Sequence, residues 1–155
     1  MKALSLTQPW AQLVVWGQKQ FETRSWRTAH RGPIAIHASK SFPKWAREFC
    51  DDEHFFEVLG SNWAESAPLG AIVGIVSVIS CLPTEVVIEQ TISMDEQAFG
   101  DWSPGRYAWG LNGPLWLIDP IPVRGMLGLW TLPQDVEGRL TVKLSHHRHP
   151  TENVR

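Results

Sequence analysis

The sequence has few cysteines, the residues that form disulfide bonds and many zinc sites, and it carries no excess of basic charge. Cys50 and Cys81 are its only cysteines, and their wide separation excludes the C-x-x-C spacing of zinc and redox sites. We therefore expect two reduced thiols, no metal and no cofactor. The formal net charge is -2, so a long electrostatic contact with a nucleic-acid duplex is not expected, and any nucleic acid would be held by a local patch.

Long apolar segments are also lacking. The longest run, AIVGIVSVIS, is rich in β-branched residues and is shorter than the roughly 20 residues that a membrane-spanning helix needs. The first residues, MKALSLTQPW, do not contain the apolar core of a signal peptide. These two absences predict a cytoplasmic protein without a membrane partner. The oligomeric state stays open.

Tryptophan, by contrast, is abundant. The chain has 155 residues and nine tryptophans, which is more than the core of a single domain requires, so we expect some of the rings to line a groove where they can stack on a base or a sugar. A globular domain is expected over residues 1–133. From residue 134 to 155 the apolar pattern fades, and we expect a polar, flexible tail whose histidines, in SHHRHPTENVR, lack the scaffold of a metal site.

The periodicity of apolar residues predicts an α+β fold. Strands are expected over residues 3–6, 20–26, 33–39 and 70–82, the last a central strand because it is apolar on both faces. Two more, 106–111 and 114–123, are separated by Asn-Gly, a hairpin signal. A helix is expected within 7–17 and another over 44–59, with Trp45, Phe49 and Phe56 as its apolar stripe, and one or two helical turns within 84–106. Many short strands with few helices favour a small mixed β-barrel with flanking helices.

The stretch GQKQFETRSW, residues 17–26, combines three charged residues with aromatic ones. Alternation along a strand places Glu22 and Arg24 on one face, with Lys19 in the turn before it. Two interpretations are open at this point. The group is either an exposed charge cluster, worth at most about 1 kcal/mol, or a strand edge that faces a ligand.

The chain resembles a known family in several segments taken in order. LSLTQPWAQLVVWGQKQFETRSW, followed by RGPIAIHASK, is similar to the opening of ASCH domains, which carry a Q-P-W helix, a G-x-K-x-x-E-x-R turn and strand, and an R-G-x-x-x-I-H-A strand. EQAFGDWSPGRYAWGL and PIPVRGMLGLWTLP resemble the second half of phage and bacterial members. The resemblance spans residues 3–133. It implies a PUA-like β-barrel whose cleft, between barrel and helices, binds RNA or nucleotides.

The same resemblance assigns candidate catalytic residues. Lys19, Glu22 and Arg24 match the lysine, glutamate and arginine of the family turn, and Glu96 matches a glutamate that faces the cleft. Some bacterial members hydrolyse N4-acetylcytidine with a lysine and, three residues on, a threonine. Here that position is Glu22, which is a departure from the amidohydrolase pattern.

A metal-independent hydrolysis can be written with these residues. Lys19, partly desolvated beside Arg24, would supply a neutral amine as base or nucleophile; Glu22 could be the base instead, and Glu96 would protonate the leaving amine. Arg24 would hold an oxyanion or a phosphate. The nucleophile stays open between Lys19, a carboxylate-activated water and Thr23.

Further residues are candidates for substrate binding. Trp10 or Trp26 would stack on a pyrimidine, and Ser39, with Lys40, and Arg106 would contact an anion. His37 is expected to be a hydrogen-bonded interior histidine. The resulting hypothesis is a domain that binds a pyrimidine nucleoside or nucleotide and hydrolyses N4-acylated cytidine-type substrates. The alternatives are a non-catalytic module for single-stranded RNA and a ribonuclease.

Overall fold

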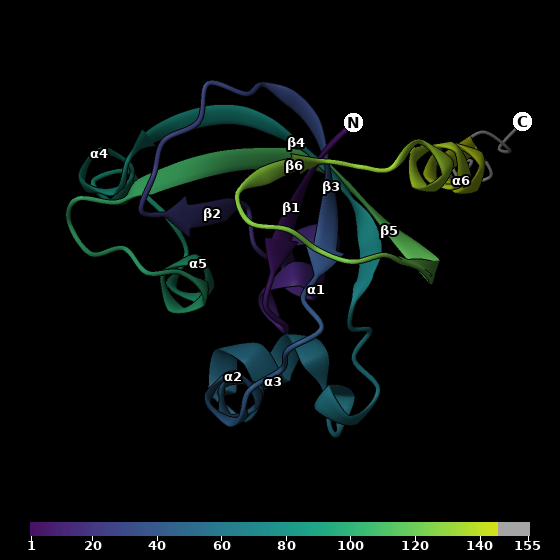
Figure 1. Ribbon diagram of the computed structural model, residues 1–155. Helices are drawn as coiled ribbons and strands as arrows, with labels where there is room; N and C mark the ends of the chain where they lie inside the picture. Colours follow the sequence, from purple (N-terminus) through teal and green to yellow (C-terminus); the bar gives the residue numbers. More distant parts are fainter. Residues whose placement is uncertain (146–155) are drawn as a thin grey trace, which may run out of the picture.

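One curved six-stranded sheet forms the centre of the protein (Figure 1). The computed structural model describes residues 1–145. The strand order is β2-β5-β4-β3-β1-β6; only the β1–β3 pair is parallel. The sheet curls into a half-barrel. Its two end strands, β2 and β6, are not hydrogen-bonded neighbours in the strand order. The predicted α+β class with a mixed sheet is confirmed. The strands are β1 (Lys2–Leu6), β2 (Phe21–Arg24), β3 (Gly32–Ala38), β4 (Ala71–Pro83), β5 (Tyr107–Pro122) and β6 (Leu129–Thr131).

Strand β5 corrects one prediction. The hairpin expected at Asn112–Gly113 is absent, and residues 107–122 form one continuous strand that pairs with β4 over its length. Asn112 pairs with Ser77 and Leu115 with Ile75, so two residues of β5 face one residue of β4. Gly113 has φ 59, and a glycine with positive φ is typical of a β-bulge. The Asn-Gly pair thus bends a strand instead of reversing it, because β4 is long enough to pair with both halves.

Helix α1 (Trp10–Val15) covers the concave side of the sheet. Its residues Leu13, Val14 and Val15 are almost fully buried. The predicted helix is confirmed; it ends at Val15, and Gly17, two residues on, has a φ of 76, a conformation that glycine adopts without strain. The chain then turns directly into β2.

The helix expected over residues 44–59 is two helices, α2 (Lys44–Phe49) and α3 (Glu53–Leu59). Asp52 begins the second one by accepting a hydrogen bond from the His54 N–H at 3.1 Å. Aspartate is a preferred N-cap residue, so the Asp-Asp pair interrupts a continuous helix.

This interruption changes which side chains are buried. Trp45, Phe49 and Phe56, expected to form the apolar stripe, are 56%, 42% and 45% exposed, so that prediction was wrong. Phe55 and Leu59 are buried in their place, because the break between the helices shifts the helical phase of α3.

The remaining helices are short or lie at the end of the described chain. Helices α4 (Thr84–Ile88) and α5 (Met94–Phe99) confirm the expected helical turns, and a 3-10 turn covers Trp63–Glu65. Helix α6 (Gln134–Ser145) occupies part of the segment expected to be a flexible tail. Its Val136 and Leu140 are buried against the sheet, so this part is packed structure. The rest of the predicted tail, 146–155, lies outside the described residues.

Two observations concern the cysteines and the lack of long apolar segments. Cys50 is a buried free thiol and Cys81 a half-buried one. Among residues 1–145, no helix has both the length and the apolar character needed to cross a membrane.

Candidate functional site

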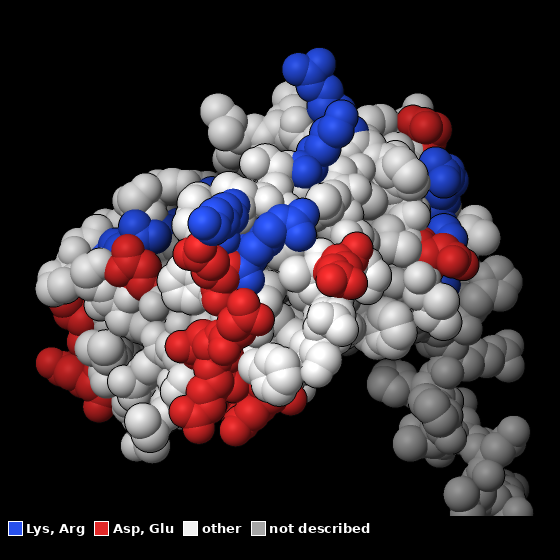
Figure 2. Space-filling view, turned by 90° about the horizontal axis from the view of Figure 1, so that it is seen from below, with Lys and Arg blue, Asp and Glu red and all other residues white. Residues whose placement is uncertain are grey.

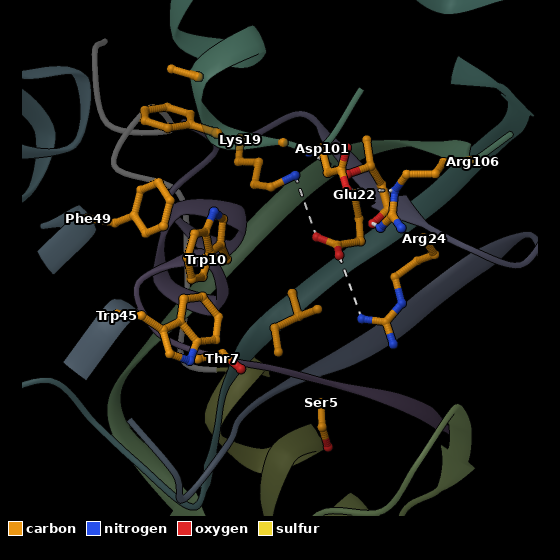
Figure 3. Close-up of a pocket in the computed structure, with 15 residues that line it drawn as sticks. Ser5, Thr7, Trp10, Lys19, Glu22, Arg24, Trp45, Phe49, Asp101 and Arg106 are labelled. Atoms are coloured by element: carbon orange, nitrogen blue, oxygen red, sulfur yellow. Dashed lines mark hydrogen bonds and ion pairs between the residues drawn. The ribbon is translucent and has the colours of Figure 1, made fainter. Parts of the chain in front are cut away.

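A cleft of about 620 Å³ opens where the ends of β1 and β2 meet α1, α2 and the loop after α5. Charged side chains from β2 and its preceding turn form one side of the cleft, and aromatic side chains of α1 and α2 form the opposite side (Figure 3). We call these the charged wall, made of Lys19, Glu22 and Arg24, and the aromatic wall, made of Trp10, Trp45 and Phe49.

The charged wall is an ion-pair chain. Lys19 Nζ lies 3.5 Å from Glu22 Oε2, and Glu22 Oε1 lies 3.7 Å from Arg24 Nη1 (Figure 3). The side chains of Lys19 and Glu22 are only 2% and 10% exposed. Because these two side chains are buried, the charged wall is not a solvated surface cluster. Buried charges are rare unless they have hydrogen-bonding or charged partners. Lys19 Nζ also donates to the Phe21 carbonyl oxygen.

Glu96 holds the backbone that follows Lys19. Both carboxylate oxygens of Glu96 accept backbone hydrogen bonds, from the Gln20 N–H at 2.9 Å and the Phe21 N–H at 3.0 Å. Helix α5 presents this side chain, with Ser93 accepting from the Glu96 N–H at its N-terminus. Burial raises the pKa of the Glu96 carboxyl, although the backbone donors and the Lys19 charge oppose the shift.

Glu96 therefore does not occupy the expected position at the cleft. It is 5% exposed and is not among the residues that line the cleft. Its carboxylate holds the backbone one and two residues after Lys19. On this geometry we propose a positioning role for Glu96, in place of the proton donor expected from the sequence.

Arg106 lies at the edge of the same cleft, as predicted. Its Nη2 donates to the Thr23 carbonyl at 3.0 Å, and its Nε lies 3.5 Å from Asp101 Oδ2. The Asp101 N–H in turn donates to Thr23 Oγ1 at 3.1 Å. Thr23 lines the cleft as well, but its hydroxyl is already engaged by the loop after α5.

Asp101 was not predicted from the sequence. The hydrogen bonds from Ser103 lower the pKa of its carboxyl, with the Arg106 charge contributing. The D-W-S spacing is a signal for such a turn, since aspartate often accepts from the backbone two residues on. That spacing does not reveal that the turn faces β2.

The aromatic wall contains one predicted residue and two unexpected ones. Trp10 was predicted as a stacking residue, and its ring centroid lies 5.8 Å from that of Trp45 and 5.3 Å from that of Phe49. Trp45 and Phe49 were expected in the core, but they remain exposed and line the cleft. Their spacing of four residues puts them on one side of α2, which the sequence does not distinguish from a core-facing stripe.

Two predicted binding residues lie elsewhere. Trp26 packs edge-on against Trp109, with 4.7 Å between ring centroids, and the Arg24 guanidinium lies 5.6 Å from the Trp26 ring. Trp26 therefore supports Arg24 and does not line the cleft. Ser39 lines a second, neighbouring cleft. His37 is a hydrogen-bonded interior histidine, as predicted.

The charge of the cleft differs from that of the whole chain. Its lining holds the cations Lys19, Arg24 and Arg106 and the carboxylates of Glu22 and Asp101, a local excess of one positive charge on a chain with a formal net charge of -2. Basic and acidic side chains lie side by side on the face in Figure 2, without one extended basic surface. The cleft thus suits a planar, partly anionic ligand of limited size.

Comparison with known proteins places these features in a family context. A sequence model described as "ASCH domain" matches residues 4–113. Activating signal cointegrator 1 of Homo sapiens is 29% identical over 135 residues, which cover 86% of this chain and 22% of that protein. The Mus musculus protein of the same name is 29% identical over 136 residues, with the same coverage. The chain thus spans 22% of the length of these relatives.

Solved structures show the same fold. The crystal structure of ASCH from Zymomonas mobilis matches with a TM-score of 0.57 and 13% identity, covering 91% of this chain and 93% of that one. A mutant of that protein matches with a TM-score of 0.56 and 14% identity, covering 91% and 96%. At this level of identity the similarity concerns the fold alone.

Proposed function

The chain belongs to the ASCH domain family, and from this premise we propose that its cleft binds single-stranded RNA by holding one pyrimidine nucleotide between the aromatic and the charged wall. The observation that carries the proposal is the pair of exposed aromatic side chains, Trp45 and Phe49, opposite a buried ion-pair chain. ASCH domains resemble PUA-like modules, and the relatives named above include a signal cointegrator.

Each wall has a chemical role in this proposal. Stacking of a base on an aromatic ring contributes about 1–3 kcal/mol and tolerates any base. Arg24 and Arg106 are donors for a phosphate, and the Glu22 carboxylate is an acceptor for the exocyclic amine of cytosine. The combination favours cytidine nucleotides in a single strand, because a paired base has neither its faces nor its edge free.

Binding is tested with a fluorescent short oligocytidylate and equilibrium anisotropy. Replacement of Trp45 by alanine removes stacking surface, and we expect the affinity to fall by roughly 5- to 150-fold, the equivalent of about 1–3 kcal/mol. Trp116→Ala is the matched control, since Trp116 is 46% exposed on β5 and does not line the cleft. Equal affinities of the two variants would contradict a stacking role for the aromatic wall.

A second candidate function is hydrolysis of the N4-acyl group of cytidine. The specific observation in its favour is the Lys19–Glu22 pair, which is withdrawn from bulk water yet lines the cleft. Such burial of charged groups in a concave site is typical of catalytic positions. The departure from threonine at position 22 removes one nucleophile but supplies a carboxylate base.

The reaction can be written with the residues that line the cleft. Glu22 takes a proton from water, the oxygen adds to the acyl carbon, and the Arg24 guanidinium or the Lys19 ammonium balances the oxyanion. The C–N bond then breaks, the proton passes from Glu22 to the leaving amine, and the products are cytidine and a carboxylic acid. Glu96 has no direct step, because its oxygens hold the backbone of β2.

Hydrolysis is tested by following cytidine release from N4-acetylcytidine in the presence of EDTA. Glu22→Gln keeps the shape of the side chain and removes the base, so we expect release to stop. Unchanged release by Glu22→Gln, or by the double variant Lys19→Ala/Arg24→Ala, would exclude this mechanism. RNA binding without release of cytidine would leave a binding module. Cleavage of RNA but not of the equivalent DNA would indicate the ribonuclease alternative.

A further inference from the structure

A second cleft, of about 920 Å³, adjoins the first one. It lies between the end of β3, the segment before β4 and the loop that joins β5 to β6. Ser5 of β1 lines both clefts, so the two share a boundary at that residue. The residues that line the second cleft include His37, Ser39, Lys40, Gly70, Arg124 and Gly125.

The second cleft is basic. Lys40 and Arg124 are exposed, and neither forms an ion pair with another residue of the described chain. No aspartate or glutamate is among the described residues that line this cleft. In the first cleft, by contrast, every cation faces a carboxylate within 4 Å. The cations of the second cleft therefore remain available for an external anion.

The floor of the second cleft is fixed by hydrogen bonds. His37 is 2% exposed; its Nδ1 lies 3.0 Å from Ser5 Oγ and its Nε2 lies 2.8 Å from the Val123 carbonyl oxygen. Trp130 Nε1 donates to the same Ser5 Oγ at 3.2 Å. These contacts tie the loop carrying Arg124 to β1 and β3, so Arg124 projects from a backbone that is anchored on one side.

The loop also approaches the sheet closely and presents apolar side chains outward. A Cβ at Gly125 would lie 2.7 Å from His37 Nδ1 and 2.8 Å from Ser5 Oγ, so only glycine fits there. Beyond it, Met126 is 60% and Leu127 98% exposed, and both line the second cleft. An apolar rim beside two unpaired cations matches a nucleotide, which joins an apolar base face to a phosphate.

We propose that the second cleft is a subsite for the neighbouring nucleotide of the same RNA strand, with Lys40 and Arg124 on its phosphate and the Met126–Leu127 rim against its base. The strand passes from one cleft to the other over Ser5, and the Ser39 hydroxyl lies on the same side as a further donor. This inference rests on the proposed function, since it extends the ligand of the first cleft. A free nucleoside would fill the first cleft alone.

The test compares the salt dependence of affinity for a short oligocytidylate among three proteins. These are the unchanged chain, Lys40→Ala/Arg124→Ala, and the control Lys44→Ala/Arg139→Ala, whose residues are exposed and line neither cleft. Each lost phosphate contact on a single strand reduces the slope of log affinity against log salt by about 0.7. Because Lys40 and Arg124 contact one phosphate in this proposal, we expect Lys40→Ala/Arg124→Ala to lose about 0.7 of the slope and the control to keep it. Cytidine monophosphate, which occupies the first cleft, should bind all three proteins equally.

The possible failures are distinct. If the unchanged chain binds the oligonucleotide and Lys40→Ala/Arg124→Ala keeps its affinity and slope, the second subsite is excluded while the first stands. The second subsite is also excluded if the oligonucleotide binds no more tightly than cytidine monophosphate, and inorganic phosphate competes with it in the unchanged chain but not in Lys40→Ala/Arg124→Ala. Lys40 and Arg124 would then form a site for a free anion. If the unchanged chain binds neither RNA nor cytidine monophosphate, the proposed function itself is overturned.

Discussion

At the scale of single residues, Glu96 separates a positioning role from a catalytic one. Its carboxylate accepts two backbone N–H groups at the start of β2, whereas a role at the substrate would require access to the cleft. The two roles predict different outcomes for Glu96→Gln, because glutamine has the shape of glutamate but only one side-chain oxygen.

We expect Glu96→Gln to destabilise the fold. The glutamine oxygen can accept from one backbone N–H, but its amide nitrogen then faces the other donor, and an unsatisfied buried group costs about 1–3 kcal/mol. Urea unfolding at neutral pH measures this loss, with the exposed Glu89→Gln as a control. Wild-type stability together with abolished cytidine release would contradict the positioning role.

The residue scale also shows how far sequence reasoning reaches into the site. The alternation along residues 20–26 predicts that Glu22 and Arg24 share a face, and the structure confirms it with an ion pair. Asp101 and Trp45 come from segments far away in the chain, and no local pattern relates them to β2. The grouping of Lys19, Glu22 and Arg24 could be predicted because they lie in one strand and the turn before it. The other residues of the cleft are brought there by tertiary packing.

At the scale of elements, a titratable contact joins α3 to α5, the helix whose end lines the cleft. His54 of α3 lies with its Nδ1 2.6 Å from Asp95 Oδ1 of α5. The hydrogen bond to Asp95 raises the pKa of His54 above its ordinary value of 6.5, with the nearby carboxylates contributing. Helix α5 carries Glu96 on the same turn, so the contact also helps to hold the charged wall.

This contact predicts a pH-dependent stability. Because the folded-state pKa of His54 is raised, its stabilisation is fully present below about pH 6.5 and is lost as the pH rises through the folded-state value. We expect His54→Gln to lower the melting temperature at about pH 5.5, and the difference from the unchanged chain to shrink towards about pH 9. Thermal unfolding across this range measures it. A difference that stays constant with pH would show that charge on His54 is not involved.

Elements were predicted best where one strand or helix has a complete local signal. The apolar run of β4 and the Pro9-to-Gly17 segment around α1 both gave correct elements. The Asn-Gly pair misled, because whether it forms a turn or a bulge depends on the partner strand. The helix break at Asp52 was also missed, since its capping bond competes with a helical pattern that continues on both sides.

At the scale of the whole molecule, α6 determines where the packed domain ends. Leu140 is 1% exposed and belongs to a cluster with Trp130, Leu117 and Ile121. We propose that the domain extends through residue 145, beyond the boundary at 133 that composition favours. The sequence of α6 is mostly polar, so composition does not indicate that Val136 and Leu140 are buried.

We expect Leu140→Ala to cost about 2–5 kcal/mol of unfolding free energy, as for other fully buried leucines. Arg139→Ala, one residue earlier and exposed, should change stability by less than about 0.5 kcal/mol. Chemical denaturation of both variants measures the difference. Equal stabilities would mean that α6 does not contribute to the fold, and the boundary at 133 would then be the better description.

The central claim concerns the whole molecule as well: a chain with a net charge of -2 binds RNA in a local cleft lined by aromatic rings. Nine tryptophan indoles report on different parts of the fold. Those of Trp10 and Trp45 line the cleft, whereas Trp109 and Trp130 are buried in the core.

The most direct test is therefore titration of the ¹⁵N-labelled protein with a short oligocytidylate, followed through the indole N–H resonances. The account predicts shifts at Trp10 and Trp45 that saturate together, with Trp109 and Trp116 unchanged. Saturable binding that leaves the Trp10 and Trp45 signals in place, or no binding at all, would contradict it.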